Sequence, residues 1–555
     1  MSGRSGTDAT KVQPNHYWDR ETAFVAQLAA CVSFISFAYY FQHGGLLLYG
    51  DAVAHINIAR RVFDSQTPGL LQLGTVWLPL PHLLMIPFLL SDSAWQSGIG
   101  GAIPSMVAYV LGTAGIFRLV RNALSVNCGP SPTGRIAAWL SAVVYAANPN
   151  LIYLQTTAMT ESVYLALFVW AMVYFNEFIR RSPSSDESPA AISSLTKCGL
   201  CLVGACLTRY DGWFLAVAMC VTVLAVAWKR NNPSLRRGVA KFILLAAAAP
   251  VVWLAYNAII YRNPLEFANG PYSARAIEQK NANPGSPPHP GSHDLPVAFS
   301  YFLKSAELNM SEASLQKVWV TLILAATIGI VLRERRLWPL LLLWAPVPFY
   351  MLSIAYSGVP VFLPAWWPFS FYNVRYGLQL LPLFSISAAV TVYFLLRLAQ
   401  NKIAKTVVLS VAAILLGISY ASVWRAHPVC YREAWVNSRT RIAFETELAS
   451  NLKKLRYDST LLMYLGDHVG AIEQAGIHLL RTVNEGNHRP WRSPDPDGLW
   501  EHALAKPGVY VDWVVAIDGD PVALAMQKLS LPSIAVIRTA GQPTATIYWA
   551  HKDSL

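Results

Sequence analysis

Apolar stretches of roughly 20 residues, long enough to cross a lipid bilayer, recur along the first three quarters of the chain. Short polar segments separate them, and only 13% of all residues are charged, against about a quarter in an ordinary soluble domain. The sequence therefore predicts a polytopic α-helical membrane protein. By length we expect about eleven membrane-spanning helices, at residues 22–42, 99–119, 136–153, 162–179, 198–213, 214–228, 242–261, 318–332, 338–356, 376–398 and 406–423.

Basic residues are concentrated in alternate turns between these stretches, and this bias predicts an orientation. Lys and Arg near helix ends favour the cytoplasmic side; the turns that carry them are "RLVRNALS", "FIRRSP", "WKRNNPSLRRGVAK", "LRERRLW" and "LRLAQNKIAK". We therefore expect a cytoplasmic N-terminal tail, residues 1–21, and an external C-terminus. Membrane lipids are the expected partners of these turns. Most of the formal net charge of +12 lies in these turns, so no nucleic acid partner is expected.

The turns on the opposite side are longer and predict the remaining organisation. In a first outer loop, residues 44–98, the apolar residues of 52–63 recur at helical spacing, which favours a helix in the membrane interface. A long outer loop, residues 262–317, is rich in Pro, Gly and Asn, as is typical of a mobile lid or a substrate loop. These loops belong to a transmembrane domain, residues 22–424. Residues 425–555 alternate helix-like and strand-like pieces and predict a soluble α/β domain on the outer face.

Four ionisable residues follow the first spanning helix directly, in "LLLYGDAVAHINIARRVF". Asp51 and His55 are four residues apart and share a helix face, and Arg60 and Arg61 follow one to two turns later. A lone Asp here would be a solvated helix end. With basic neighbours in a partly dehydrated cleft, however, a carboxylate can act as a general base, and the cations can hold a phosphate. Asp51 is therefore a candidate catalytic residue, and His55, Arg60 and Arg61 are candidate substrate-binding residues.

Further ionisable residues lie at the outer ends of later helices, at similar expected depth. They are Glu161, Arg209, Asp211 and Arg375. Their placement allows them to converge with Asp51 on one site. Ionisable groups at membrane depth are by default functional candidates, although an Arg at a helix end can also be an interface anchor. Two nearby tyrosines, Tyr210 and Tyr372, could flank a sugar or a lipid, but tyrosines at this depth are also ordinary interface residues.

Several of these features occur together in one known superfamily. They are a long first outer loop that opens with an acidic residue, a second acid in "TTAMTESVY", the segments "LTRYDGW" and "VRYGLQLLP", and an appended outer domain. This combination, over roughly residues 22–423, resembles the GT-C glycosyltransferase superfamily. More narrowly it is similar to the polyprenyl-phosphate-sugar branch, which includes protein O-mannosyltransferases and aminoarabinose transferases.

The resemblance implies an enzyme that transfers a sugar from a polyprenyl phosphate, with inversion, to a glycan, lipid or protein acceptor at the outer face. It implies Asp51 as the catalytic base, Glu161 as an assisting catalytic carboxylate, and Arg209 and Arg375 as the groups that neutralise the departing phosphate. The sugar would be a hexose or a pentose, with a mannosyltransferase-like reaction. We expect a bacterial inner membrane of the cell envelope, because the chain lacks retention signals and has few outward glycosylation sequons.

The chain departs from the protein mannosyltransferases in one respect. They carry adjacent acidic residues in the first loop, whereas Asp51 is followed by Ala52. His55 could compensate in part or mark another acceptor class. No cofactor is expected for a monophosphate donor. A divalent metal ion stays open as an alternative, because Asp51, His55, Glu161 and Asp211 are all possible ligands.

Two other classes of protein are compatible with many helices and buried ionisable groups. The first is a transporter or lipid flippase, which would use these groups for alternating access. The gathering of charge at outer helix ends and the lack of a recognisable inverted repeat argue against it. The second is an inactive membrane scaffold whose outer domain binds a partner. Loss of Asp51 would not affect any chemistry of such a scaffold.

Overall fold

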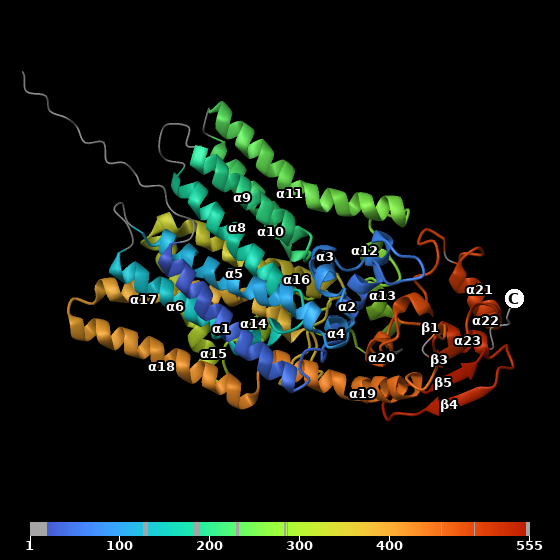
Figure 1. Cartoon of the computed structure of the whole chain (residues 1–555). Coiled ribbons are helices and arrows are strands. Elements are labelled where there is room, and N and C mark those ends of the chain that lie inside the picture. Colours follow the sequence, from blue (N-terminus) through green and yellow to red (C-terminus); the bar gives the residue numbers. More distant parts are fainter. Residues whose placement is uncertain are drawn as a thin grey trace, which may run out of the picture.

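Long helices occupy the first three quarters of the chain, where the apolar stretches predict them (Figure 1). The computed structural model describes residues 19–125, 131–181, 189–228, 232–281, 285, 287–456, 458–492 and 494–550. Within these residues, nine helical segments are long and apolar enough to span a membrane. They are α1 (Arg20–Gln42), α5 (Ile99–Ala123), α8 (Glu161–Arg181), α9 (Pro189–Cys206), α11 (Pro233–Ile260), α15 (Leu315–Leu332), η3 (Arg335–Trp344) with α16 (Pro346–Tyr356), η4 (Val374–Leu380) with α17 (Leu381–Leu398), and α18 (Lys402–Ala426) with α19 (Val429–Leu452). The chain is an integral membrane protein, as predicted.

Two of the eleven expected crossings are shorter than the others. They correspond to α6 (Pro132–Ala146) and α10 (Asp211–Ala227), with 15 and 17 residues. The stretch predicted at 136–153 ends early because Asn148 starts a separate short helix, α7 (Pro149–Leu154). The Asn148 side chain accepts hydrogen bonds from two backbone N–H groups of α7, the usual role of an N-cap.

The expected boundary between the fifth and sixth crossings, at residue 213, is wrong. The helix α9 ends at Cys206 and α10 begins at Asp211. The turn falls on "LTRY" because the charged side chains of Arg209 and Asp211 are drawn into a polar cluster at this end of the bundle.

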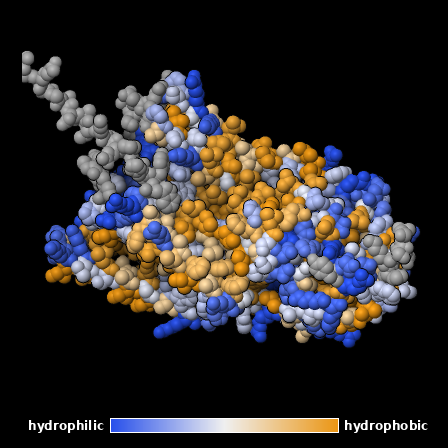
Figure 2. Space-filling model, in the orientation of Figure 1, coloured by the Kyte–Doolittle hydropathy of each residue, from blue (hydrophilic) through white to orange (hydrophobic). Residues whose placement is uncertain are grey.

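The spanning helices form a buried centre and an apolar periphery. In α8 and in the η4–α17 segment, 78% and 83% of the most apolar window is buried, against 17% in the last segment, which contains α18. The helices at the periphery of the bundle expose large apolar side chains, among them Phe34, Leu244 and Ile403. Figure 2 shows the result as an orange apolar surface over the helical part, with bluer polar surface towards both ends. Such an apolar surface is compatible with lipid and not with water.

The predicted first outer loop folds into short helices that pack on the bundle. They are α2 (Gly50–Arg61), η1 (Leu70–Leu73), α3 (Leu80–Met85), η2 (Ile86–Phe88) and α4 (Asp92–Gln96). Residues Ala52, Ile56 and Ala59 of α2 are fully buried. The polar side chains of His55 and Asn57 are almost fully buried as well. The helix α2 is therefore enclosed by protein, which differs from the expected position on the membrane surface.

The predicted long outer loop contains three helices, α12 (Glu266–Asn269), α13 (Ala274–Asn281) and α14 (Leu295–Leu308). The last of them is part of the bundle: α14 packs against η4 and α16, and its Phe302 stacks on Tyr350 with ring centroids 4.7 Å apart. At its C-terminal end this loop therefore contributes to the packing around η4.

A mixed five-stranded sheet forms the C-terminal end of the molecule (Figure 1). Its order is β2-β1-β3-β5-β4, with β1 parallel to β2 and β3, and β5 antiparallel to β3 and β4. The expected α/β fold of this part is confirmed. The strands are β1 (Leu461–Met463), β2 (Thr482–Val483), β3 (Trp513–Ile517), β4 (Ser533–Ile537) and β5 (Ala545–Trp549), and the helices are α20 (Val469–Ala475), η5 (Leu479–Arg481), α21 (Leu499–Ala505), α22 (Pro507–Tyr510) and α23 (Pro521–Met526).

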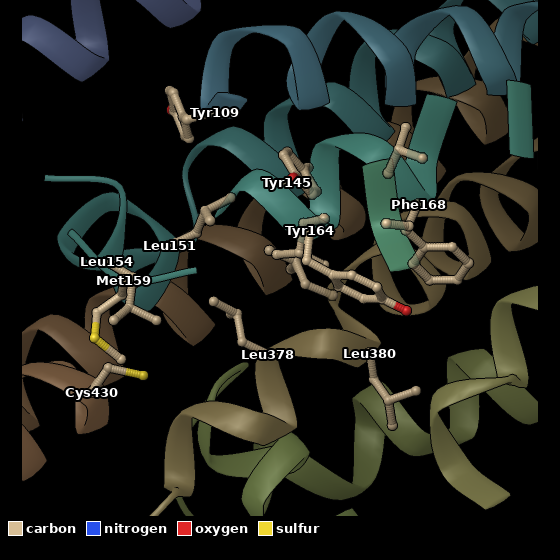
Figure 3. Close-up of a cluster of buried hydrophobic side chains, with 14 of the residues drawn as sticks. Tyr109, Tyr145, Leu151, Leu154, Met159, Tyr164, Phe168, Leu378, Leu380 and Cys430 are labelled. Atoms are coloured by element: carbon tan, nitrogen blue, oxygen red, sulfur yellow. The ribbon is translucent and has the colours of Figure 1, made fainter. Parts of the chain in front are cut away.

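A cluster of large apolar side chains joins α8 to η4 (Figure 3). Tyr164 and Phe168 lie one and two turns after the start of α8, and Leu378 and Leu380 of η4 belong to the same buried cluster. Protein interiors are as densely packed as organic crystals. The cluster therefore fixes the start of α8 relative to η4, which positions the two elements that carry Glu161 and Arg375.

Candidate active site

Arg375 lies between three carboxylates that come from distant parts of the chain. Its Nη2 is 2.6 Å from Asp51 Oδ2, its Nη1 is 2.7 Å from Glu433 Oε1, and its Nε is 3.3 Å from Glu161 Oε1. Asp51 is in the first turn of α2, Glu161 begins α8, and Glu433 lies on α19. One buried cation therefore ties η4 to three other helices at the end of the bundle that carries the sheet.

Arg209 brings a second guanidinium to the same carboxylate. Its Nη1 is 3.2 Å from Glu161 Oε1 and its Nε is 3.4 Å from Asp211 Oδ1. Its Nη2 donates a hydrogen bond to the Tyr350 hydroxyl at 2.9 Å, and this hydroxyl donates to Asp211 Oδ2 at 2.9 Å. The structure thus brings together the five residues Asp51, Glu161, Arg209, Asp211 and Arg375, which we call the charge cluster.

Asp51 differs from the other carboxylates of Arg375 in its accessibility. The Asp51 side chain is 41% exposed, whereas those of Glu161 and Glu433 are 0% and 1% exposed. Within the described part of the chain, Glu161 Oε2 and the neighbouring Ser162 Oγ are enclosed and have no hydrogen-bond partner. Buried polar atoms are normally paired. The start of α8 therefore keeps two unpaired polar atoms inside the protein, whereas Asp51 is the carboxylate of Arg375 that solvent reaches.

Two further predicted residues lie beside the charge cluster. His55 is on the same face of α2 as Asp51 and is 2% exposed. Burial, and then the nearby Arg375 and Arg209, lower the pKa of His55 to about 3, so His55 is neutral at ordinary pH. Tyr372 packs its ring on Phe362, is 43% exposed, and interacts electrostatically with Asp51.

The expected substrate-binding role of Arg60 is not supported by its surroundings. Arg60 is 3% exposed, and each of its three guanidinium nitrogens has a partner. Its Nε is 2.8 Å from Asp64, its Nη2 is 2.6 Å from Asp92, and its Nη1 donates to the Leu89 carbonyl at 2.6 Å. Because each of its guanidinium nitrogens is engaged inside the protein, Arg60 holds the first outer loop together and is not open to a substrate.

Arg61 and Tyr210 also lie outside the charge cluster. The Arg61 side chain lies next to Gly486 of the C-terminal domain. A Cβ atom added to this glycine would be 3.8 Å from Arg61 Nη1. Its Nε is buried without a hydrogen-bond partner among the described residues. The Tyr210 hydroxyl donates to the Val76 carbonyl at 2.9 Å and its ring stacks on Phe267. Tyr210 therefore joins two outer loops, whereas Arg61 is a half-buried cation next to the C-terminal domain.

Three residues of the site are missing from the sequence-based candidates. Glu433 follows the last expected crossing, in a segment that reads as part of the soluble domain. An acid soon after a spanning helix is the same signal that singled out Asp51, and it could have found Glu433. Tyr350 lies within an apolar helix, where the only signal is that a buried tyrosine hydroxyl needs a partner. His82, a partner of His55, carries no local signal.

The described residues hold no group of three or more His, Cys, Asp or Glu side chains arranged for a metal ion. Three of the possible metal ligands named from the sequence are paired with arginine. Glu161 and Asp211 are paired with Arg209, and Asp51 is paired with Arg375. Guanidinium groups thus occupy the positions next to these carboxylates.

The C-terminal part of the chain holds the segment that carries Asp51. Arg441 of α19 donates from Nη2 to the carbonyls of Leu47 and Leu48, at 3.0 Å each. Glu473 of α20 accepts a hydrogen bond from Asn57 of α2 at 2.5 Å. Helix α2 is therefore held at both its start and its middle by residues of α19 and α20.

Replacing Glu473 with glutamine is expected to change the pH dependence of stability. Burial raises the pKa of the Glu473 carboxyl to about 8, against about 4.3 in an unfolded chain. The folded state therefore keeps a proton that the unfolded state loses, so the stabilisation is complete below about pH 4 and is lost as the pH rises to about 8. The variant Glu473→Gln should match the wild type near pH 4.5 and exceed it by about 2–4 kcal/mol at pH 8.5.

Thermal unfolding in detergent across this pH range measures the difference. Glu447→Gln, on the exposed face of α19, is the control for loss of a carboxylate. An identical pH dependence in wild type and Glu473→Gln would show that Glu473 is ionised in the folded protein.

Comparison with known proteins places the fold. Neither a protein-family profile nor a curated protein sequence matches the chain. The structure of ArnT from Cupriavidus metallidurans bound to undecaprenyl phosphate is similar, with 14% sequence identity, a TM-score of 0.58, and coverage of 96% of this chain and 98% of that chain. For apo ArnT from the same organism the values are 14%, 0.58, 95% and 97%. The apo oligosaccharyltransferase of Archaeoglobus fulgidus is less similar, at 12% identity and a TM-score of 0.49 over 91% of this chain and 70% of that one. Over nearly its whole length, the chain therefore has the GT-C fold of the aminoarabinose transferase ArnT.

Proposed function

We propose that the protein is a membrane glycosyltransferase that moves a sugar from a polyprenyl-phosphate donor to an acceptor, with inversion. The observation that carries the proposal is the state of Asp51: Arg375 holds this carboxylate at 2.6 Å, yet 41% of the side chain stays accessible. A held but reachable carboxylate suits a general base. The shared fold with ArnT, whose structure was solved with undecaprenyl phosphate bound, supports a lipid phosphate as the carrier of the sugar.

In the proposed reaction, Asp51 accepts the proton of an acceptor hydroxyl or amine. The freed electron pair forms the new bond to the anomeric carbon of the sugar. The bond between that carbon and the phosphate oxygen breaks on the opposite face, and its electron pair leaves with the polyprenyl phosphate. Arg209 and Arg375 provide positive charge for the departing phosphate, and Arg375 also orients Asp51. These guanidinium groups supply the cationic stabilisation, so the reaction that we propose needs no divalent metal ion.

We also propose that the charge cluster faces the outside of a bacterial inner membrane. The basic turns support this orientation, because α8 begins with Glu161 in the cluster and ends with Arg180 and Arg181, about 30 Å away. Basic residues favour the cytoplasmic side. The N-terminus would then be cytoplasmic and the sheet domain external. The acceptor would be a glycan, a lipid or a protein at the outer face.

The proposal is tested by incubating the purified protein in lipid nanodiscs with a panel of polyprenyl-phosphate hexoses and pentoses and following the release of polyprenyl phosphate. Release with at least one donor, stimulated by an extract of envelope acceptors and insensitive to a chelator, is expected. The same donors are then tested in vesicles that contain the protein. Movement of an intact donor across the bilayer, with no release of polyprenyl phosphate in either format, would replace the proposal with a flippase.

A further inference from the structure

Two buried histidines of the first outer loop form a pair beside the charge cluster. His55 Nδ1 lies 2.9 Å from His82 Nε2, which is hydrogen-bond distance. His55 is 2% exposed and His82 is 0% exposed. The ring of Trp77 packs on His55, with centroids 4.6 Å apart. Both the position and the plane of the His55 ring are therefore fixed by neighbours on α3 and the turn before it.

Both rings are neutral. Burial, and then Arg375 and Arg209, lower the pKa of His55 to about 3. Burial, and then His55 and Arg61, lower the pKa of His82 well below its usual value. A neutral imidazole carries one N–H and one lone pair. The hydrogen bond between the two rings therefore has only two possible proton arrangements.

The surroundings of His82 distinguish these two arrangements. His82 Nδ1 is fully enclosed and has no hydrogen-bond partner in the described part of the chain. If His55 donated to His82, the His82 proton would lie on this enclosed Nδ1. A buried donor without a partner costs about 1–3 kcal/mol, and orphaned N–H groups are rarer than unpaired acceptors. The favoured arrangement is therefore the other one, in which His82 Nε2–H donates to His55 Nδ1.

In this arrangement the proton of His55 lies on Nε2, on the side of the ring away from His82. This nitrogen has no hydrogen-bond partner among the described residues, but unlike His82 Nδ1 it is not fully enclosed, so water or a ligand can reach its proton. His55 also stands one turn after Asp51 on the same face of α2. We infer that His82 is a positioning residue which fixes His55 as a neutral Nε2–H donor to a phosphate oxygen of the lipid-linked donor substrate. The inference rests on the proposed glycosyl transfer. It assigns the phosphate a neutral hydrogen bond from His55 besides the charges of Arg209 and Arg375.

Variants of His82 separate this role from simple packing. His82→Leu removes the donor and keeps bulk, and should lower kcat/KM by about 10- to 100-fold, the usual effect of losing a group that orients a ligand. His82→Gln should retain activity within a few-fold, because a glutamine amide can still donate to His55 Nδ1. In a His55→Leu background, His82→Leu should cost little more, because the ring that it orients is gone. His468→Leu, which removes another buried histidine with an unpaired Nδ1, is the control.

A spectroscopic readout makes the test independent of turnover. Selective ¹⁵N labelling of the 12 histidines, with His55 assigned from the signal lost in His55→Gln, reports which ring nitrogen carries the proton. We expect His55 to be protonated on Nε2 in the wild type and to become a mixture in His82→Leu. Protonation on Nδ1 in the wild type, or equal losses of activity in His82→Gln and His82→Leu, would overturn the inference. If the wild type turns over no donor, the proposed function fails, and the ¹⁵N result still decides the proton arrangement.

Discussion

The variant Asp51→Asn is expected to turn over polyprenyl-phosphate sugar about 10²- to 10⁴-fold more slowly than the wild type, the usual contribution of a general base. Asparagine keeps the size of the side chain and an oxygen that can accept the hydrogen bond from Arg375 Nη2, but it cannot take up the acceptor proton. The donor should therefore still bind. Release of polyprenyl phosphate gives the rate, and retention of the lipid on the immobilised protein gives the binding.

Glu433→Gln is the matched control for Asp51→Asn. Both carboxylates contact Arg375 at nearly the same distance, but the Glu433 side chain is enclosed and cannot meet an acceptor. Its loss should therefore lower the rate much less. If Asp51→Asn keeps more than half of the wild-type rate, Asp51 is not the base. If Glu161→Gln is the slowest of the three, the proton transfer belongs to Glu161.

The variant Arg375→Gln is expected to lose both stability and donor binding. It leaves Asp51, Glu161 and Glu433 close together without the cation that they share. Removing one partner of a buried charged group typically costs about 3–5 kcal/mol, so the melting temperature in detergent should fall clearly. Affinity for the polyprenyl-phosphate sugar should fall as well, because a guanidinium next to the phosphate is lost.

Two comparisons separate these two effects of Arg375→Gln. Arg209→Gln leaves Glu161 paired with Arg375, so it should weaken donor binding with a smaller loss of stability. The double variant Arg375→Gln/Glu433→Gln removes one of the stranded charges and should recover part of the stability but none of the binding. A double variant that regains donor binding would show that Arg375 has only a structural role.

The membrane part of the fold and most of the charge cluster could be predicted from sequence. Helix length and apolar content follow directly from the thickness of the bilayer, so every expected crossing contains a helix. Helix ends are held at the membrane faces, which is why Asp51, Glu161, Arg209 and Arg375 could be placed at one depth. Their convergence requires only that the helices pack side by side.

The residues that could not be placed depend on contacts between segments far apart in the chain. Arg60 and Arg61 are adjacent in sequence, but successive residues of a helix point about 100° apart. One is enclosed by Asp64 and Asp92, while the other faces the C-terminal domain. Asp64, four residues after Arg60, was a local sign of this pairing. Glu433 reaches Arg375 only because α19 packs against η4, and no periodicity in the sequence reports that packing.

The charge cluster is drawn from segments far apart along the chain, so its parts are synthesised at different times. Its members run from Asp51 to Arg375, their partner Glu433 lies on α19, and α2 is held by Arg441 and Glu473. Because a ribosome delivers the chain from its N-terminus, Asp51 is inserted into the membrane long before its neighbours are synthesised. The nascent protein therefore passes through the insertion machinery with its site unassembled. The cluster and its supports are complete only when Glu433, Arg441 and Glu473 have been translated and have packed against the earlier helices.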